Sequence, residues 1–307
     1  MMLTSFFGKS SPINFLLLSI FIGLFGLLSF FWEGTAMFQW MEFLKVLGII
    51  ILLVFSMLLL DFFIRKNYLN TSNTFAIFVF SCSVAVLPSI KNLDIVFAQF
   101  LQLLAFRRIF SLNSGKNMEK KILDAALWIS LASYFYFWSI LLLGVLYLAI
   151  ANLPSRKVRY FLIPPIGICA LFSIATAYFL VVENSFDWFW HWPEKISLHF
   201  TPYAYPKLLI FITLFLSITV WSLFFRLSNT AEVPKKYRNN YLLVVFATIA
   251  SFFVVLFSAQ KSGGELLFLV APSSIVIAGY LEKKGDMLLK ELIMWCILFI
   301  PFTIFFL

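Results

Sequence analysis

Apolar runs of about 17 to 25 residues recur from one end of the 307-residue chain to the other. As a helix, a run of this length crosses about 30 Å of hydrocarbon and satisfies its own backbone hydrogen bonds, as lipid requires. The composition agrees, because 62% of the residues are hydrophobic and only 12% are charged, too few for a soluble surface. The sequence therefore predicts an all-α, polytopic transmembrane helix bundle in which residues 1–307 form a single integral membrane domain.

Charged and turn-forming residues separate the apolar runs and predict about eleven membrane helices. The predicted spans are 14–32, 43–61, 73–90, 93–110, 122–136, 138–153, 160–182, 206–225, 240–259, 265–281 and 288–306. With a cytoplasmic N-terminus, the 23 Lys and Arg residues all lie inside except Lys45, Lys91, Lys195, Lys207 and Lys261. This bias predicts a multi-pass protein of the bacterial inner (cytoplasmic) membrane. It also explains the net charge of +9 by orientation and attraction to membrane lipids, so no nucleic-acid partner is expected.

Residues 122–153 could form one long helix or two short ones. A single crossing would move the later basic residues to the outer side, so the positive-inside bias favours two helices. Each half, of about 15 residues, reaches only about 22 Å. We therefore expect a short helical hairpin that turns near residues 134–138. Two charge pairs spaced i,i+4 are also expected at cytoplasmic helix ends: Asp61 with Arg65, and Lys120 with Asp124.

Three outer carboxylates are the catalytic candidates. Glu33 and Glu42 flank the first outer loop, and Asp94 lies at the end of the second. Loops that follow the first and third spans can approach each other above a bundle, so these acids could share a cleft. Paired carboxylates there act as a general base or hold a divalent cation, the one cofactor considered. The alternative is that they are unrelated, solvated loop acids.

The segment QKSGGELLFL begins the tenth predicted span. Ser262 and Glu265 have the spacing of a capping box, and the two glycines between them permit a tight turn. A compatible functional interpretation adds Lys261 to the backbone amides of a helix start, a combination that binds a lipid phosphate or pyrophosphate. The candidate substrate-binding residues here are Lys261, Ser262, Gly263 and Gly264.

The longest predicted outer loop, 183–205, contains NSFDWFWHWPEKISLHF, with three tryptophans and both histidines of the chain. Tryptophans in such a loop are typical of an aromatic belt at the membrane interface. The alternative is an aromatic lip whose rings stack on a sugar or isoprenoid substrate. The histidines are eight positions apart, without the spacing that places two ligands on one helix face, so no metal site is predicted. The candidate substrate-binding rings are Trp188, Trp190 and Trp192.

The central stretch RRIFSLNSGKNMEKKILDAALWISLASYFYFWSILLLGVLYLAI, residues 107–150, resembles an uncharacterised family of multi-pass membrane proteins from flavobacteria and their relatives. The resemblance spans the full chain and implies membership of a domain family of unknown function. A more distant, topological resemblance is to the GT-C glycosyltransferases, which use polyprenyl-phosphate sugars. It is carried by Glu33 or Glu42, Asp94, the short helices within 122–153, and Lys261 followed by Leu266, Leu267 and Pro272.

These observations lead to two classes of function. The first is a GT-C-like transferase that uses a lipid-linked sugar at the outer face, with the acids as base or metal ligands. In this hypothesis Lys261 and the following helix start hold the phosphate of a polyprenyl-phosphate carrier. The alternative is a non-catalytic membrane subunit or scaffold of an envelope complex, with another membrane protein as its partner. A transporter ranks below both, because the sequence shows neither an inverted repeat nor charged residues near mid-membrane.

Overall fold

The computed structural model describes residues 2–32, 40–71, 73–88, 92–153, 157–259, 261–283 and 285–306. These ranges are mostly helical, and no strand occurs in them. The α-helices are α1 (Leu3–Phe7), α2 (Pro12–Trp32), α3 (Trp40–Lys66), α4 (Phe75–Val84), α5 (Leu93–Phe110), α6 (Met118–Phe135), α7 (Leu142–Ala151), α8 (Val158–Glu183), α9 (Trp188–His191), α10 (Pro206–Ser228), α11 (Lys235–Phe257), α12 (Leu267–Glu282) and α13 (Met287–Phe306). Short 3-10 turns include η3 (Phe137–Leu141), η4 (Thr201–Ala204) and η6 (Gly264–Leu266). The predicted all-α bundle is confirmed.

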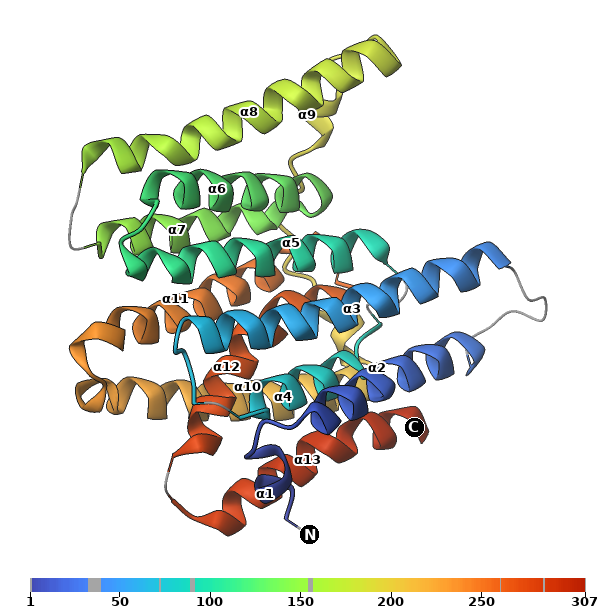
Figure 1. Cartoon of the computed structure of the whole chain (residues 1–307). Coiled ribbons are helices and arrows are strands. Elements are labelled where there is room, and N and C mark those ends of the chain that lie inside the picture. The colour runs from blue at the N-terminus through green and yellow to red at the C-terminus, as the bar shows by residue number, and fades with distance from the viewer. Residues whose placement is uncertain are drawn as a thin grey trace.

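The long helices run side by side and reverse direction from one to the next (Figure 1). In the described part of the chain, seven are long and apolar enough to cross a membrane, and two shorter apolar helices accompany them, Phe75–Val84 and Phe137–Ala151. Every one of the predicted spans contains a helix. The sequence pattern therefore located the helices, and length together with apolar composition makes seven of the described ones able to cross a membrane.

The helix ends gather at two opposite ends of the bundle. We call one the basic end, because α3 and α5 finish there on basic residues and α11 begins there with two lysines. The opposite end holds the tryptophan-rich segment 184–205 between α8 and α10, and we call it the aromatic end. In Figure 1 the basic end lies on the left and the aromatic end on the right.

Burial separates central from peripheral helices. In the segment Gly264–Glu282, which contains α12, 89% of the most apolar 18-residue stretch is buried inside the bundle. In the corresponding stretch of α8 the buried share is 6%. Small and β-branched residues along α12 let α4, α10 and α11 pack closely around it. At the edge of the bundle, α8 packs on α6, where a Cβ on Gly167 would lie 2.9 Å from the Cβ of Ala126. Most other α8 side chains are exposed and apolar, as expected of a helix that faces lipid.

Helix α4 is much shorter than the predicted span 73–90. Its ten residues reach about 15 Å, roughly half of the hydrocarbon thickness. The helix ends at Val84 and is followed by a turn that leads to Pro88, a residue that disfavours helix before it. All ten residues of α4 are buried in the bundle, so its ends do not face lipid. The prediction of a full span was therefore wrong in length.

The helical hairpin predicted within 122–153 is confirmed. Helix α6 ends at Phe135, Tyr136 adopts an extended conformation with φ −147° and ψ 100°, and η3 leads into α7. The turn therefore falls where five consecutive aromatic residues occur in the sequence. Helix α6 starts four residues earlier than predicted, at Met118, and is the longer arm.

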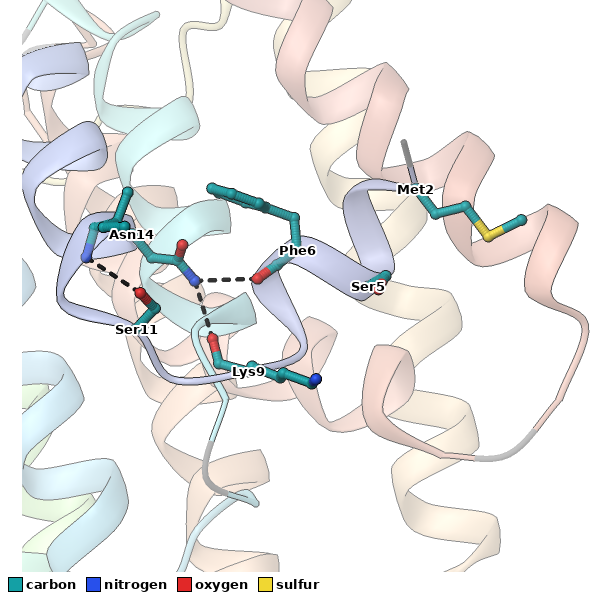
Figure 2. Close-up of a pocket in the computed structure, with 7 residues that line it drawn as sticks. Met2, Ser5, Phe6, Lys9, Ser11 and Asn14 are labelled. Carbon is teal, nitrogen blue, oxygen red and sulfur yellow. Dashed lines mark hydrogen bonds between the residues drawn. The ribbon is translucent and has the colours of Figure 1, made fainter.

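Helix α1 was not predicted, because its five residues are too few for a sequence pattern to reveal. Its N-terminus is capped by α13: the Glu291 carboxylate accepts hydrogen bonds from Leu3 N (2.5 Å), Thr4 N (3.1 Å) and Thr4 Oγ1 (2.8 Å). The joint between α1 and α2 is fixed by the Asn14 amide, which donates to Phe6 O at 3.2 Å and Lys9 O at 3.0 Å (Figure 2). A hollow of about 510 Å³ lies beside this joint, but its Asn14 donors are already used within the chain.

Candidate functional site

An open cleft of about 560 Å³ lies at the aromatic end of the bundle. It is bounded by the start of α5, the end of α6, the end of α8 and the short helix α9. We call it the acidic–aromatic cleft. The residues that line it are Asp94, Tyr134, Phe135, Phe179, Glu183, Asp187, Trp188, His191 and Trp192.

Asp94 is placed in the cleft by the start of α5. The side-chain oxygen of Asn92 accepts hydrogen bonds from the backbone N–H groups of Asp94 (3.1 Å) and Ile95 (3.3 Å), which is a regular N-cap. A carboxylate in the first turn of a helix is also stabilised by the helix dipole. The Asp94 side chain is exposed, and no hydrogen bond or ion pair joins its carboxylate to another described residue. It is therefore available to a ligand.

Two further carboxylates reach the cleft from the other side. Helix α8 ends at Glu183 because Asn184 adopts a left-handed conformation with φ 50°. Asp187 follows immediately before α9, and the Nδ1 atom of His191 lies 2.8 Å from the Asp187 carbonyl oxygen. In the described part of the chain, no group of three His, Cys, Asp or Glu residues is arranged to hold a metal ion. The three acids thus line the cleft from two sides.

Trp188 and Trp192 form a fixed aromatic wall. The indole N–H of Trp192 donates to the Ser133 carbonyl oxygen of α6 at 2.8 Å. Its ring packs edge-on against Phe172 of α8, with centroids 4.9 Å apart. The Trp188 ring stacks on Phe179 at 5.7 Å with an interplanar angle of 11°. Rings held in this way keep their orientation before any ligand arrives, which lowers the entropic cost of binding.

A second polar constellation at the same end surrounds Glu265, whose side chain is fully buried. Its carboxylate accepts hydrogen bonds from Ser262 N (3.1 Å), Ser262 Oγ (3.1 Å) and Gly263 N (3.0 Å). The phenol of Tyr203 donates a fourth bond, and burial beside Glu265 raises the pKa of that phenol. We call this group the Glu265 cap. The backbone amides that could bind a phosphate are therefore occupied by a carboxylate of the same chain.

Lys261 belongs to the Glu265 cap as a helix C-cap. Its ammonium group donates to the carbonyl oxygens of Leu256 (2.8 Å), Val255 (3.3 Å) and Ser258 (3.4 Å) at the end of α11. It also lies 4.8 Å from the ring centroid of Phe200. Burial lowers the pKa of Lys261, an effect that the nearby Glu265 opposes. A cation that satisfies the last carbonyls of a helix is a stabilising element.

Comparison with known families places the whole chain in one group. Residues 7–307 match DUF6427, a family of unknown function. The chain belongs to this family. Membership of DUF6427 confirms the predicted uncharacterised family, and the match covers nearly the entire bundle. No curated protein and no solved structure matches the chain.

The DUF6427 chain brings only some of the predicted site residues together. Asp94, Trp188 and Trp192 line the acidic–aromatic cleft, whereas Trp190 is 77% exposed and does not line it. Glu42 forms an exposed pair with Lys45 at 3.1 Å, outside the cleft. Glu33 lies outside the described residues. The other candidates, Lys261, Ser262, Gly263 and Gly264, lie in the Glu265 cap.

Sequence reasoning did not select six residues that line the cleft. Two are acids near the start of the aromatic loop, three are rings from α6 and α8, and one is the histidine at the end of α9. A usable signal was present, because the acids alternate with aromatic residues in this loop and the hairpin turn is itself aromatic. These residues are Tyr134, Phe135, Phe179, Glu183, Asp187 and His191.

Proposed function

We propose that this DUF6427 chain is an inner-membrane protein whose acidic–aromatic cleft binds the sugar headgroup of a lipid at the outer face. The observation that carries the proposal is the combination of uncommitted carboxylates with a fixed indole wall in one cleft. Carboxylates accept hydrogen bonds from hydroxyl groups, and flat rings stack on the apolar faces of sugars. The basic end then faces the cytoplasm, as the positive-inside bias predicts.

The charge of the cleft supports a neutral headgroup. Among the described residues that line the cleft, three are acidic and none is Lys or Arg. A phosphate or pyrophosphate would be repelled by the acids and would find no Lys or Arg among these described residues. The hydroxyl groups of an uncharged sugar carry no such penalty.

The neighbouring surface supports a lipid rather than a free sugar. Phe179 and Glu183 of α8 line the cleft, while Tyr178, Val181 and Val182 of the same helix end are exposed. An acyl or isoprenoid chain can therefore lie along α8 while its headgroup occupies the cleft. This arrangement matches a ligand with one apolar and one hydroxyl-rich part.

A GT-C-like transferase is the catalytic form of this proposal, favoured only by the accessible Asp94. In that form Asp94 removes the proton from an acceptor hydroxyl, whose oxygen bonds to the anomeric carbon of the sugar while the bond from that carbon to the phosphate breaks and polyprenyl phosphate leaves. Such a carrier needs positive charge or bound metal near its phosphate. Lys261 has its donors on α11 carbonyls, so the binding function receives more support than the transferase.

The proposal is tested by titrating octyl glucoside into the protein held in a zwitterionic detergent. We expect a saturable change in tryptophan fluorescence, because Trp188 and Trp192 line the cleft. Asp94→Asn should weaken the apparent Kd by roughly tenfold, equivalent to about 1.4 kcal/mol. The matched control is Asp286→Asn, which changes an exposed acid at the basic end and should leave the Kd unchanged.

Four outcomes would contradict the proposal. A response that does not saturate, or that Asp94→Asn leaves intact, would remove the cleft as the binding site. Saturable binding of octyl phosphate in place of octyl glucoside would favour the polyprenyl-phosphate transferase. If the chain binds neither octyl glucoside nor octyl phosphate and co-purifies with a stoichiometric membrane protein, the scaffold function is favoured.

A further inference from the structure

An open hollow of about 520 Å³ lies at the basic end of the bundle, between the first turn of α2 and the last turns of α3. We call it the basic hollow. The residues that line it are Phe15, Asp61, Phe62, Arg65 and Lys66. Its lining includes two cations and one acid, whereas the acidic–aromatic cleft at the other end is lined by three acids. The two openings therefore favour ligands of different charge.

Arg65 is contacted from two sides in the basic hollow. Its Nε atom lies 2.7 Å from Asp61 Oδ2, one turn earlier on α3. Its guanidinium carbon lies 5.4 Å from the centroid of the Phe15 ring of α2. The Nη2 atom of Arg65 has no hydrogen-bond partner among the described residues. Asp61 and Phe15 thus fix the guanidinium while some of its donors stay unused.

Lys66 and Arg107 bring further positive charge to the same place. The Nζ atom of Lys66 lies 5.2 Å from the centroid of the Phe62 ring, and the guanidinium carbon of Arg107 of α5 lies 5.1 Å from the same centroid. Neither cation makes an ion pair or a hydrogen bond with another residue in the described part of the chain. Two like charges beside one ring repel each other, and a bound anion would offset that repulsion.

The positive field extends beyond the hollow. Burial lowers the pKa of Lys121, at the start of α6, and the charges of Lys66, Arg108 and Lys116 lower it further. Lys121 therefore holds its proton less tightly than an isolated lysine does. The cations at this end lie close enough together to affect one another, so an anion that binds here meets an attractive field from several helices.

An exposed apolar stripe runs along α3 from the basic hollow toward the middle of the membrane. Its members have the helical spacing i, i+4, i+7 and i+11, and each is at least 40% exposed: Ile51, Phe55, Leu58 and Phe62. The stripe is about 16.5 Å long, close to half of the hydrocarbon thickness of about 30 Å. Phe62 also lines the hollow. An acyl chain can therefore lie along one leaflet's depth of α3 while its headgroup occupies the hollow.

We propose that the basic hollow binds the phosphate of an anionic phospholipid from the cytoplasmic leaflet. Arg65 donates hydrogen bonds to the phosphate oxygens, Lys66 and Arg107 add attraction, and the α3 stripe receives an acyl chain. The stripe that begins at the hollow favours a lipid over free phosphate. This site does not depend on the sugar-binding function, because it lies at the opposite end of the bundle and has the opposite charge.

The test titrates dioctanoyl phosphatidylglycerol into the full chain in an uncharged detergent and counts bound lipid by native mass spectrometry. Lys66→Gln combined with Arg107→Gln should weaken the apparent Kd by roughly tenfold. The melting temperature of the lipid-free variant should stay that of the wild type, because these two cations have no ion pair to lose. The matched control is Lys157→Gln combined with Lys235→Gln, which removes the same charge from exposed positions at the basic end and should leave the Kd unchanged.

Other ligands and salt separate the possible sources of binding. Dioctanoyl phosphatidylcholine should bind more weakly, because its choline group cancels the phosphate charge. Inorganic phosphate has no acyl chain and should not compete at the same concentration. Raising NaCl from about 0.1 M to about 1 M, which shortens the Debye length from about 10 Å to about 3 Å, should weaken the binding of phosphatidylglycerol to the wild type.

Specific results would overturn this site. Equal losses of affinity in the two double variants would mean that the lipid responds only to the net charge of the basic end. An unchanged Kd after Lys66→Gln with Arg107→Gln would remove the hollow as the binding site. Inorganic phosphate that competes as well as the lipid would reassign the hollow to a free anion, and equal binding of phosphatidylcholine would leave only the acyl chain as the bound group. If the variant does not fold, wild-type binding that is insensitive to salt rejects the site.

Discussion

The acidic–aromatic cleft and the Glu265 cap lie at the same end of the bundle and use the same kinds of residue. In the Glu265 cap, a buried carboxylate receives four donors and a lysine reaches three carbonyls, so each charge is matched inside the chain. In the cleft, the carboxylates lie at the surface beside rings that are already fixed. Polar groups that are matched within a fold stabilise it, and those that are positioned but unmatched are available for binding.

Replacing Glu265 should produce the largest loss of stability. Glu265→Ala leaves the donors of Ser262, Gly263 and Tyr203 without their acceptor in a buried site, which costs about 3 kcal/mol or more. We expect a large fall in melting temperature, measured by differential scanning fluorimetry in detergent. The control Glu42→Ala removes an exposed pair and should change the free energy of unfolding by less than about 0.5 kcal/mol. Equal effects of the two changes would show that the cap is not structural.

A side chain at Gly263 should cost somewhat less. Gly263 has φ +91°, and an added Cβ would lie 2.7 Å from Leu208 Cδ1. Backbone strain and overpacking together should make Gly263→Ala destabilising by about 2 kcal/mol. Gly48→Ala is the matched control, because a Cβ there meets nothing within 4 Å and the site is helical. A neutral Gly263→Ala variant would mean that the turn before α12 is not tightly constrained.

Lys261 distinguishes the two regions most directly. Lys261→Met keeps most of the apolar stem and removes the donors to the α11 carbonyls, so we expect a loss of about 1 kcal/mol in stability. Binding of octyl glucoside at the cleft should stay intact. If the variant is fully stable but loses binding of octyl phosphate, Lys261 is a phosphate ligand, as the transferase hypothesis requires.

The smallest expected effect is a pH dependence at Glu194. Burial raises the pKa of Glu194 above its ordinary value of 4.5, although a hydrogen bond from Ala259 N opposes the shift. The folded protein then holds this proton more tightly than the unfolded chain, so stability falls as pH rises from about 4.5 through the raised pKa. Glu194→Gln should be slightly more stable than the wild type at neutral pH. The difference in melting temperature should vanish on acidification, and a difference that grows would contradict the assignment.

The sequence predicted the helix positions well, because hydrophobic length is a local property. The sequence predicted ion-pair partners and the length of α4 less well, because both depend on how the helices pack against one another. The expected pair Asp61–Arg65 forms at 2.7 Å, but Asp124 pairs with Arg108 of α5 at 2.9 Å. Helical spacing makes a local partner for Asp124 equally plausible, and only the packing of α5 on α6 selects the other. The length of α4 was mispredicted for a similar reason. A helix too short to cross the membrane is tolerated here because the neighbouring helices bury all ten of its residues.

The candidate site was predictable in part. Asp94 and the tryptophans stood out by residue type and by their place at helix ends. Tyr134 and Glu183 meet only because α6 packs against α8, which brings residues nearly fifty positions apart to one cleft. The spacing around Lys261 was recognised from the sequence. Spacing cannot show, however, that the Lys261 ammonium already donates its hydrogen bonds to carbonyl oxygens at the end of α11. The structure therefore shifts attention from Lys261 to the acids around the cleft.

The contact between α1 and Glu291 has a consequence for biosynthesis. Leu3 and its acceptor are separated by 288 positions, so α1 leaves the ribosome long before its cap exists. At about 5–20 residues per second, the delay is on the order of 15 to 60 s. During that interval the amides at the start of α1 lack the Glu291 acceptor. The contact can therefore form only after α13 has been synthesised, later than the packing of α2 on α3 can begin.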